Sequence, residues 1–186
     1  MRIPNILTLI RAIIIPVVAV MIYSSSQNIV LASVAVFLIA VLTDWADGYI
    51  ARNYNMKSVF GTFFDPLVDK MLILTLFFAF SNLGLIPLWM SLLVLFRELL
   101  VTGVRQVCST EKKIVGANWM GKSKFLLQTV SVAYLQLVLY FKMAGIDIII
   151  FRQVVAFYFV LFVVIVSLAF AINFVYWHRK KILSDL

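Results

Sequence analysis

Four aspartates, Asp44, Asp47, Asp65 and Asp69, are the residues of this chain whose type and spacing best suit chemistry. The chain has eight acidic residues, and half of them lie in this one stretch. Asp44 and Asp47 are three positions apart, and Asp65 and Asp69 are four apart. On a helix either spacing puts both side chains on one face. Two such helices facing each other would bring all four carboxylates around one centre.

Carboxylates held this close together repel one another, and they stay ionised only beside cations. Oxygen donors without neighbouring His or Cys suit Mg²⁺, Mn²⁺ or Ca²⁺ better than zinc. The single histidine, His178, is far along the chain near its C-terminal end. Two divalent ions about 4 Å apart are a recurrent arrangement for phosphoryl chemistry. The aspartates therefore predict a divalent-metal site for a phosphorylated substrate.

Two residues beside the first aspartate pair suit a phosphate ligand. Gly48 directly follows Asp47, and the missing side chain lets a ligand approach the backbone. Arg52 comes one helical turn later and offers a planar fork of donors that matches phosphate oxygens. The segment from Asp44 to Arg52 thus combines metal ligands with phosphate donors.

The helices that carry these residues are predicted to cross a membrane. Aliphatic, aromatic and sulfur-containing residues make up 64% of the 186-residue chain, and its mean hydropathy is +1.07. Soluble domains are roughly half apolar. A helix of about 20 residues crosses the roughly 30 Å hydrocarbon core of a bilayer. Helices are the expected spanning structure because they satisfy every backbone polar group internally.

Six long apolar segments fit this requirement. They run approximately over Asn5–Tyr23, Ile29–Arg52, Gly61–Phe80, Pro87–Cys108, Trp119–Lys142 and Ile149–Trp177. Arg11 interrupts the first segment, so we expect a retained helix there rather than a removed signal peptide. No repeat or linker divides the sequence. The expected fold is all-α, a polytopic bundle of six transmembrane helices forming a single domain over residues 1–186.

The basic residues indicate the orientation of this bundle. The net charge is +8, and the basic residues lie mainly between and at the ends of the apolar segments. That placement suits lipid headgroups and phosphorylated substrates, and we expect no nucleic-acid partner. The turns at 24–28 and 81–84 contain no Lys or Arg, and only Lys142 and Arg152 are assigned to their side. Both termini and the aspartates are therefore expected in the cytoplasm. A single cysteine, Cys108, excludes an intramolecular disulfide.

Taken together, the central residues resemble the signature of the CDP-alcohol phosphatidyltransferase family. The matching pattern is Asp44-x2-Asp47-Gly48-x2-Ala51-Arg52-x8-Gly61-x3-Asp65-x3-Asp69. The resemblance extends over the whole chain, since these enzymes have six spans with the signature on the second and third. The segments that look like the bacterial members acting on glycerol 3-phosphate are Pro4–Arg11, Asp65–Lys70, Arg97–Leu99 and Gly121–Lys124. Gln106 and Phe125 depart from those members, which have glutamate and threonine there.

This resemblance implies a membrane transferase of phospholipid biosynthesis that moves the phosphatidyl group of CDP-diacylglycerol to a small alcohol and releases CMP. It implies two Mg²⁺ or Mn²⁺ ions on Asp44, Asp47, Asp65 and Asp69, with Asp69 also the catalytic base. The residues implied to contact CDP-diacylglycerol are Asn5, Thr8, Gly48, Ala51, Arg52, Ser58 and Gly61. It further implies a homodimer in the bacterial inner (cytoplasmic) membrane.

The acceptor alcohol is a separate question. Glycerol 3-phosphate carries a phosphate that needs cations. The basic residues at or near the cytoplasmic helix ends that suit this role are Arg11, Arg97, Arg105, Lys122 and Lys124. Glycerol 3-phosphate is therefore our expected acceptor, and inositol phosphate or serine are the alternatives within the family. A divalent-cation transporter is the alternative of a different class, which would place its acids near the bilayer midplane on broken helices.

Overall fold

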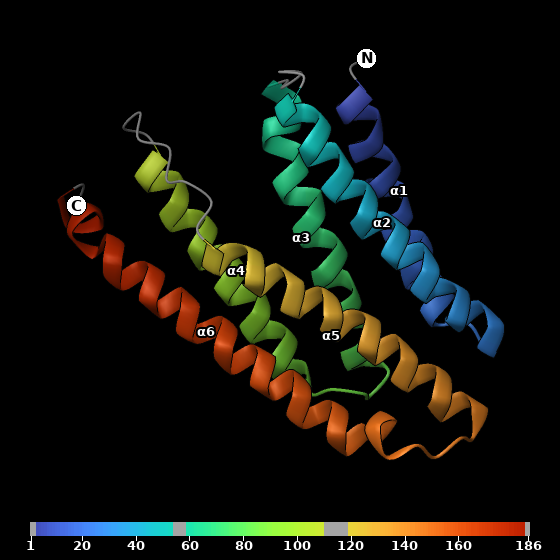
Figure 1. The fold of residues 1–186 in the computed structure, drawn as a ribbon. Coiled ribbons are helices and arrows are strands. Elements are labelled where there is room, and N and C mark those ends of the chain that lie inside the picture. The colour runs from blue at the N-terminus through green and yellow to red at the C-terminus, as the bar shows by residue number, and fades with distance from the viewer. Residues whose placement is uncertain (1–2, 54–58, 110–118, 185–186) are drawn as a thin grey trace.

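The computed structural model describes residues 3–53, 59–109 and 119–184 of the 186-residue chain. These residues form six α-helices, which confirms the predicted all-α fold (Figure 1). The helices are α1 (Ile3–Ile22), α2 (Gln27–Asn53), α3 (Val59–Asn82), α4 (Leu88–Ser109), α5 (Trp119–Ala144) and α6 (Gln153–Ser184). The first five lie within a few residues of their expected segments, whereas α6 begins later than the expected Ile149 and continues beyond the expected Trp177 to Ser184.

The last predicted segment begins as a separate short element. Ile149–Phe151 form a 3₁₀ helix, η1, and α6 begins only at Gln153. Arg152 between them has an extended backbone, with φ −66° and ψ 143°. The same side chain forms a two-point ion pair with Asp147, which ties the approach to α6 together. The expectation of a continuous helix from Ile149 was therefore wrong at its first turn.

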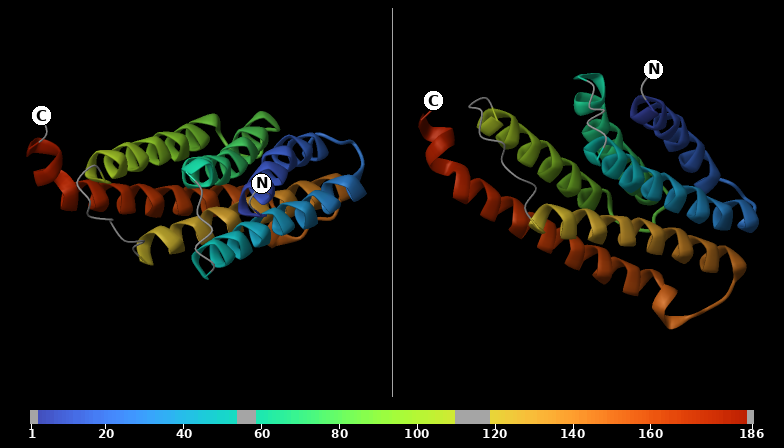
Figure 2. Two further views of the ribbon diagram at one scale, coloured as in Figure 1. Left: turned by 90° about the horizontal axis from the view of Figure 1, so that it is seen from above. Right: turned by 45° about the horizontal axis from the view of Figure 1, so that its top comes forward.

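The six helices form two layers of three (Figure 2). One layer has α3 between α1 and α4, and the other has α5 between α2 and α6. Across the layers α1 packs on α2, α3 on α5, and α4 on α6. The start of α1, the end of α2 and the start of α3 lie together at one end of the bundle (Figure 1). This signature end carries all four signature aspartate positions.

Tight turns close the opposite end of the bundle. Gly84 in the α3–α4 turn and Gly145 after α5 have φ angles of +70° and +68°. This left-handed conformation favours glycine because it lacks a Cβ atom. The Gln153 side chain at the start of α6 donates a hydrogen bond to the Gly84 carbonyl, which joins α6 to the α3–α4 turn.

The outer surface of the bundle is apolar. Side chains such as Ile13, Val20, Phe162 and Ile172 are between 57% and 72% exposed. Large apolar faces of this kind mark contact with lipid or with another protein. Among the described residues, Phe125–Ala144 and Gln153–Trp177 are long and apolar enough to cross a membrane by length and composition. The described apolar stretches of α1, α2 and α3 are shorter.

Candidate active site at one end of the bundle

One buried stripe of α1 leads to the signature end. It consists of Thr8, Arg11, Ile15, Val18 and Ile22, spaced alternately by three and four residues, and each is at most 8% exposed. This spacing keeps side chains on one face of a helix. The face lies against α2 and α3, because α1 packs on both of them. A guanidinium and a hydroxyl are therefore buried at the signature end of an otherwise apolar stripe.

The buried stripe of α2 reaches the same end. Val30, Ser33, Phe37 and Ala40 are fully buried and repeat at intervals of three and four residues. Positions 44 and 47 continue that repeat along the same unbroken helix. The first aspartate pair therefore occupies the register of the inward face of α2.

The positions of the second aspartate pair continue the buried repeat of α3. Leu72 and Leu76 are 3% and 0% exposed. Positions 65 and 69 precede them at helical spacing on the same unbroken helix. The start of α1, the end of α2 and the start of α3, toward which these three stripes lead, lie together at one end of the bundle (Figures 1 and 2). A facing arrangement of the two aspartate pairs fits this register.

Most of the predicted site side chains lie outside the described part of the structure. Ser58 is outside the described residues altogether. The backbone but not the side chain is described for Asn5, Asp44, Asp47, Gly48, Ala51, Arg52, Gly61, Asp65, Asp69, Arg105, Lys122 and Lys124. No group of three His, Cys, Asp or Glu that could hold a metal occurs among the side chains that are described. The four aspartates are not among those side chains, so the metal site stays a prediction.

Arg97, one of the predicted acceptor-phosphate residues, lies in a buried polar cluster. Its Nη1 donates a hydrogen bond to Glu98 Oε1 over 2.9 Å, and its Nε donates to the Ser167 carbonyl of α6 over 3.2 Å. The two side chains of the ion pair are only 4% and 8% exposed. Gln128 of α5 donates from Nε2 to the same Glu98 oxygen over 3.3 Å. Arg97 is therefore held inside the bundle rather than extended to the lipid interface.

A second contact joins this cluster to α3. Thr102, one turn after Glu98, donates from Oγ1 to the Glu98 carbonyl over 2.6 Å. The same hydroxyl accepts a hydrogen bond from Nζ of Lys70. Lys70 directly follows Asp69 in the chain. A hydrogen bond between the Lys70 and Thr102 side chains thus joins α4, one turn beyond the polar cluster, to α3 beside the signature.

Glu98, Thr102 and Gln128 received no role from the sequence. Glu98 and Lys70 were noticed only as parts of segments that resemble a family pattern. A usable signal was present, because polar side chains inside long apolar helices are costly and often functional. What the sequence lacked was their spatial association across α3, α4 and α5.

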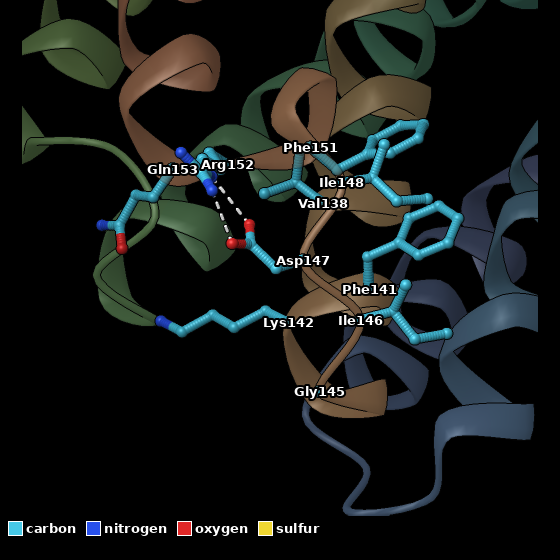
Figure 3. Close-up of a pocket in the computed structure, with 10 residues that line it drawn as sticks. All are labelled: Val138, Phe141, Lys142, Gly145, Ile146, Asp147, Ile148, Phe151, Arg152 and Gln153. Atoms are coloured by element: carbon cyan, nitrogen blue, oxygen red, sulfur yellow. Dashed lines mark hydrogen bonds and ion pairs between the residues drawn. The ribbon is translucent and has the colours of Figure 1, made fainter.

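The opposite end of the bundle has its own polar residues (Figure 3). Asp147 accepts hydrogen bonds from Arg152 Nε and Nη2 over 2.7 and 2.6 Å. The hydrogen bonds from Arg152 hold the pKa of the Asp147 carboxyl below its ordinary value. Asp147 and Arg152 line a pocket of about 260 Å³, and Lys142 and Gln153 line it as well. This pocket holds one acid and lies away from the signature, so it is not the predicted metal site.

Comparison with known proteins identifies the class of the chain. Residues 1–177 match the family described as CDP-alcohol phosphatidyltransferase. The chain belongs to this family, which confirms the resemblance seen in the sequence and makes it a transferase. Members of the family generally use divalent metal ions, which agrees with the oxygen-rich ligands of the signature.

Individual relatives have more specific names. The chain is 35% identical over 148 residues to the CDP-diacylglycerol–glycerol-3-phosphate 3-phosphatidyltransferase of Bacillus subtilis, covering 73% of this chain and 77% of that one. A Rickettsia felis protein of the same name is 36% identical over 137 residues, covering 72% and 74%. A probable phosphatidylglycerophosphate synthase of Mycobacterium tuberculosis is 39% identical over 131 residues, or 69% of this chain and 62% of that relative.

Proposed function

We propose that this chain transfers the phosphatidyl group of CDP-diacylglycerol to sn-glycerol 3-phosphate, giving phosphatidylglycerophosphate and CMP. The observation that supports it most is the convergence of the inward stripes of α1, α2 and α3 at one end, where they continue into the family signature. The names of the Bacillus and Rickettsia relatives support glycerol 3-phosphate over inositol phosphate or serine as the acceptor.

In this proposal the signature end holds the nucleotide. Asp44, Asp47, Asp65 and Asp69 bind two Mg²⁺ or Mn²⁺ ions, and such ions would neutralise charge on the pyrophosphate and on the departing CMP. An all-oxygen donor set suits these ions. The residues proposed to contact CDP-diacylglycerol are Asn5, Thr8, Gly48, Ala51, Arg52, Ser58 and Gly61. The burial of Thr8 on the inward stripe of α1 supports its place there.

The chemical step needs a base and cations for the acceptor. Asp69 accepts the proton of the glycerol 3-phosphate hydroxyl while the hydroxyl oxygen attacks the phosphatidyl phosphorus. A new P–O bond forms, the P–O bond to CMP breaks, and CMP leaves. The residues proposed to hold the acceptor phosphate are Arg11, Arg97, Arg105, Lys122 and Lys124. The buried positions of Arg11 and Arg97 support this role, because charged side chains inside a membrane bundle usually mark a substrate path.

We further propose that all six helices cross the bacterial inner membrane, with the signature end and both termini in the cytoplasm. The exposed apolar surface of the described helices supports a lipid environment. The alternation of chain direction leaves two basic residues of the described helices and turns, Lys142 and Arg152, at the other end, and so small a share there agrees with the positive-inside rule. Homodimeric assembly remains part of the proposal.

The geometry does not favour a cation transporter. Such proteins bind their ions near the bilayer midplane on discontinuous helices. Here α2 and α3 run unbroken through positions 44–47 and 65–69, and these positions lie at one end of the bundle. The transferase reading accounts for both facts.

The test is CMP release by the purified full-length protein in mixed micelles of CDP-diacylglycerol, with Mg²⁺ and glycerol 3-phosphate. We expect release that requires the acceptor, stops with EDTA and returns with added Mg²⁺ or Mn²⁺. Loss of a general base costs about 10²–10⁴-fold, so Asp69→Asn should lose at least that much activity. Asp147→Asn, the same substitution at the opposite end, is the matched control and should retain activity. Release with inositol phosphate or serine instead would overturn the acceptor, and no release with any alcohol would overturn the function.

A further inference from the structure

The ion pair between Arg97 and Glu98 is unusual in its geometry. Consecutive residues on a helix point about 100° apart and do not normally face each other. Here both side chains turn into the interior and meet over 2.9 Å. Contacts from two other helices accompany this arrangement: the Ser167 carbonyl of α6 on the arginine, and the Gln128 amide of α5 on the glutamate.

Stability alone is a poor reason for this cluster. Buried ion pairs are often replaced by apolar residues of similar size with no loss of stability, because burying two charges is costly. In a membrane bundle that cost is greater, and charges there usually serve a function. The segment of α4 that carries the cluster also contacts α3, the helix of the second aspartate pair, because the Thr102 hydroxyl, which donates to the backbone carbonyl of Glu98, accepts a hydrogen bond from Lys70.

Resting on the function proposed above, we propose that Glu98 and Gln128 are positioning residues for the acceptor phosphate. Glu98 holds the Arg97 guanidinium on the inner side of α4, and the Gln128 amide fixes the carboxylate that does so. The guanidinium is then already oriented toward the phosphate of glycerol 3-phosphate, so little side-chain conformational entropy is lost when the acceptor binds. Neither Glu98 nor Gln128 touches the reacting atoms, so their effect is on binding of the acceptor.

The chain offers a matched control on the same helix. Gln136 lies eight residues after Gln128 on α5, and its Nε2 donates one hydrogen bond, over 3.0 Å, to Ser33 of α2. Both glutamines are buried, at 2% and 0% exposure. The two side chains therefore have the same chemistry and burial and differ in their partner: Glu98 in one case, and an uncharged serine in the other.

The experiment compares Gln128→Met with Gln136→Met in full-length protein. The KM for glycerol 3-phosphate is measured at a fixed mole fraction of CDP-diacylglycerol, and the KM for CDP-diacylglycerol at a fixed concentration of glycerol 3-phosphate. Loss of a residue that orients a metal ligand typically costs about 10- to 100-fold in affinity, and we expect a comparable effect for a residue that orients a phosphate-binding guanidinium. We expect Gln128→Met to raise the KM for glycerol 3-phosphate about tenfold, with the KM for CDP-diacylglycerol within about twofold. Gln136→Met should change neither constant, and its unfolding temperature should fall because a buried hydrogen bond is lost.

Equal KM values in the two variants, with active wild-type protein, would overturn this inference and leave the proposed function intact. Inactive wild-type protein would overturn the proposed function itself. If Gln128→Met does not fold, Glu98→Gln gives a second reading, because it keeps the shape and removes the charge that holds Arg97. The same selective rise in KM is expected there. If both variants fail to fold while Gln136→Met folds, the cluster is structural and the inference is wrong.

Discussion

Removing Glu98 alone is expected to destabilise the bundle far more than removing the whole polar cluster. In Glu98→Leu the Arg97 guanidinium loses the buried carboxylate that lies 2.9 Å away and the charge-assisted hydrogen bond to it, and Gln128 loses an acceptor. The pair is at least 92% buried on each side, so solvent screens it little. Breaking such a pair costs about 3–5 kcal/mol. We expect a decrease of that size in the free energy of unfolding.

The compensated variant carries Arg97→Met, Glu98→Leu and Gln128→Met together. It removes both charges of the ion pair together with the amide that donates to Glu98, so its free energy of unfolding should lie within about 1–2 kcal/mol of the wild type. Its activity with glycerol 3-phosphate should nevertheless be lost. Stability and activity would then separate, as expected of residues kept for function.

Reversible unfolding in mixed micelles with increasing SDS measures both free energies, and the four tryptophans of the chain supply a fluorescence signal. Two results would refute the reasoning. One is a loss of less than about 1 kcal/mol of unfolding free energy in Glu98→Leu, which would mean that water or another group compensates the charge of Arg97. The other is a triple variant as unstable as the single one, which would mean that the cluster itself stabilises the fold.

Three further predictions concern the core, the outer turn and the orientation. Phe77→Ala should cost about 3–5 kcal/mol of unfolding free energy, and Phe96→Ala less than about 1, because Phe77 is fully buried and Phe96 is 61% exposed. Arg152→Gln should raise the pKa of the Asp147 carboxyl toward its ordinary value, as read by carbon NMR, since Arg152 lowers it. The ion pair is thus present above the ordinary carboxyl pKa and is lost as the pH falls through the lowered one. In intact cells an impermeant thiol reagent should label Asp147→Cys, made in a Cys108→Ser background, but not the native Cys108.

Each of these has a contrary outcome. Equal losses for the two phenylalanines would show that the exposed face of α4 is covered by protein rather than lipid. An unchanged carboxyl titration would mean that Arg152 does not act on Asp147 in solution. Labelling of Cys108 from outside would invert the proposed orientation.

The helices and the class of the protein could be predicted from local features of the amino-acid sequence. Apolar segments of membrane length predict helices because backbone polar groups in lipid require internal hydrogen bonds, and this is a local property. The spacing of Asp44, Asp47, Asp65 and Asp69 is also local, so the signature and its family could be identified before any fold was known. The confirmed family and the six helices follow from these two facts.

The buried face of each helix and the identity of its neighbours became known from the packing of the bundle. Helices that contact lipid are apolar on every side, so the amphipathic pattern that marks the core face of a soluble helix is weak here. The sequence could therefore single out polar residues such as Thr8 and Arg11, but it held no signal for the two layers of helices or for the contact between Glu98 and Gln128. These contacts join α3, α4, α5 and α6 across long stretches of chain, and packing alone brings them together.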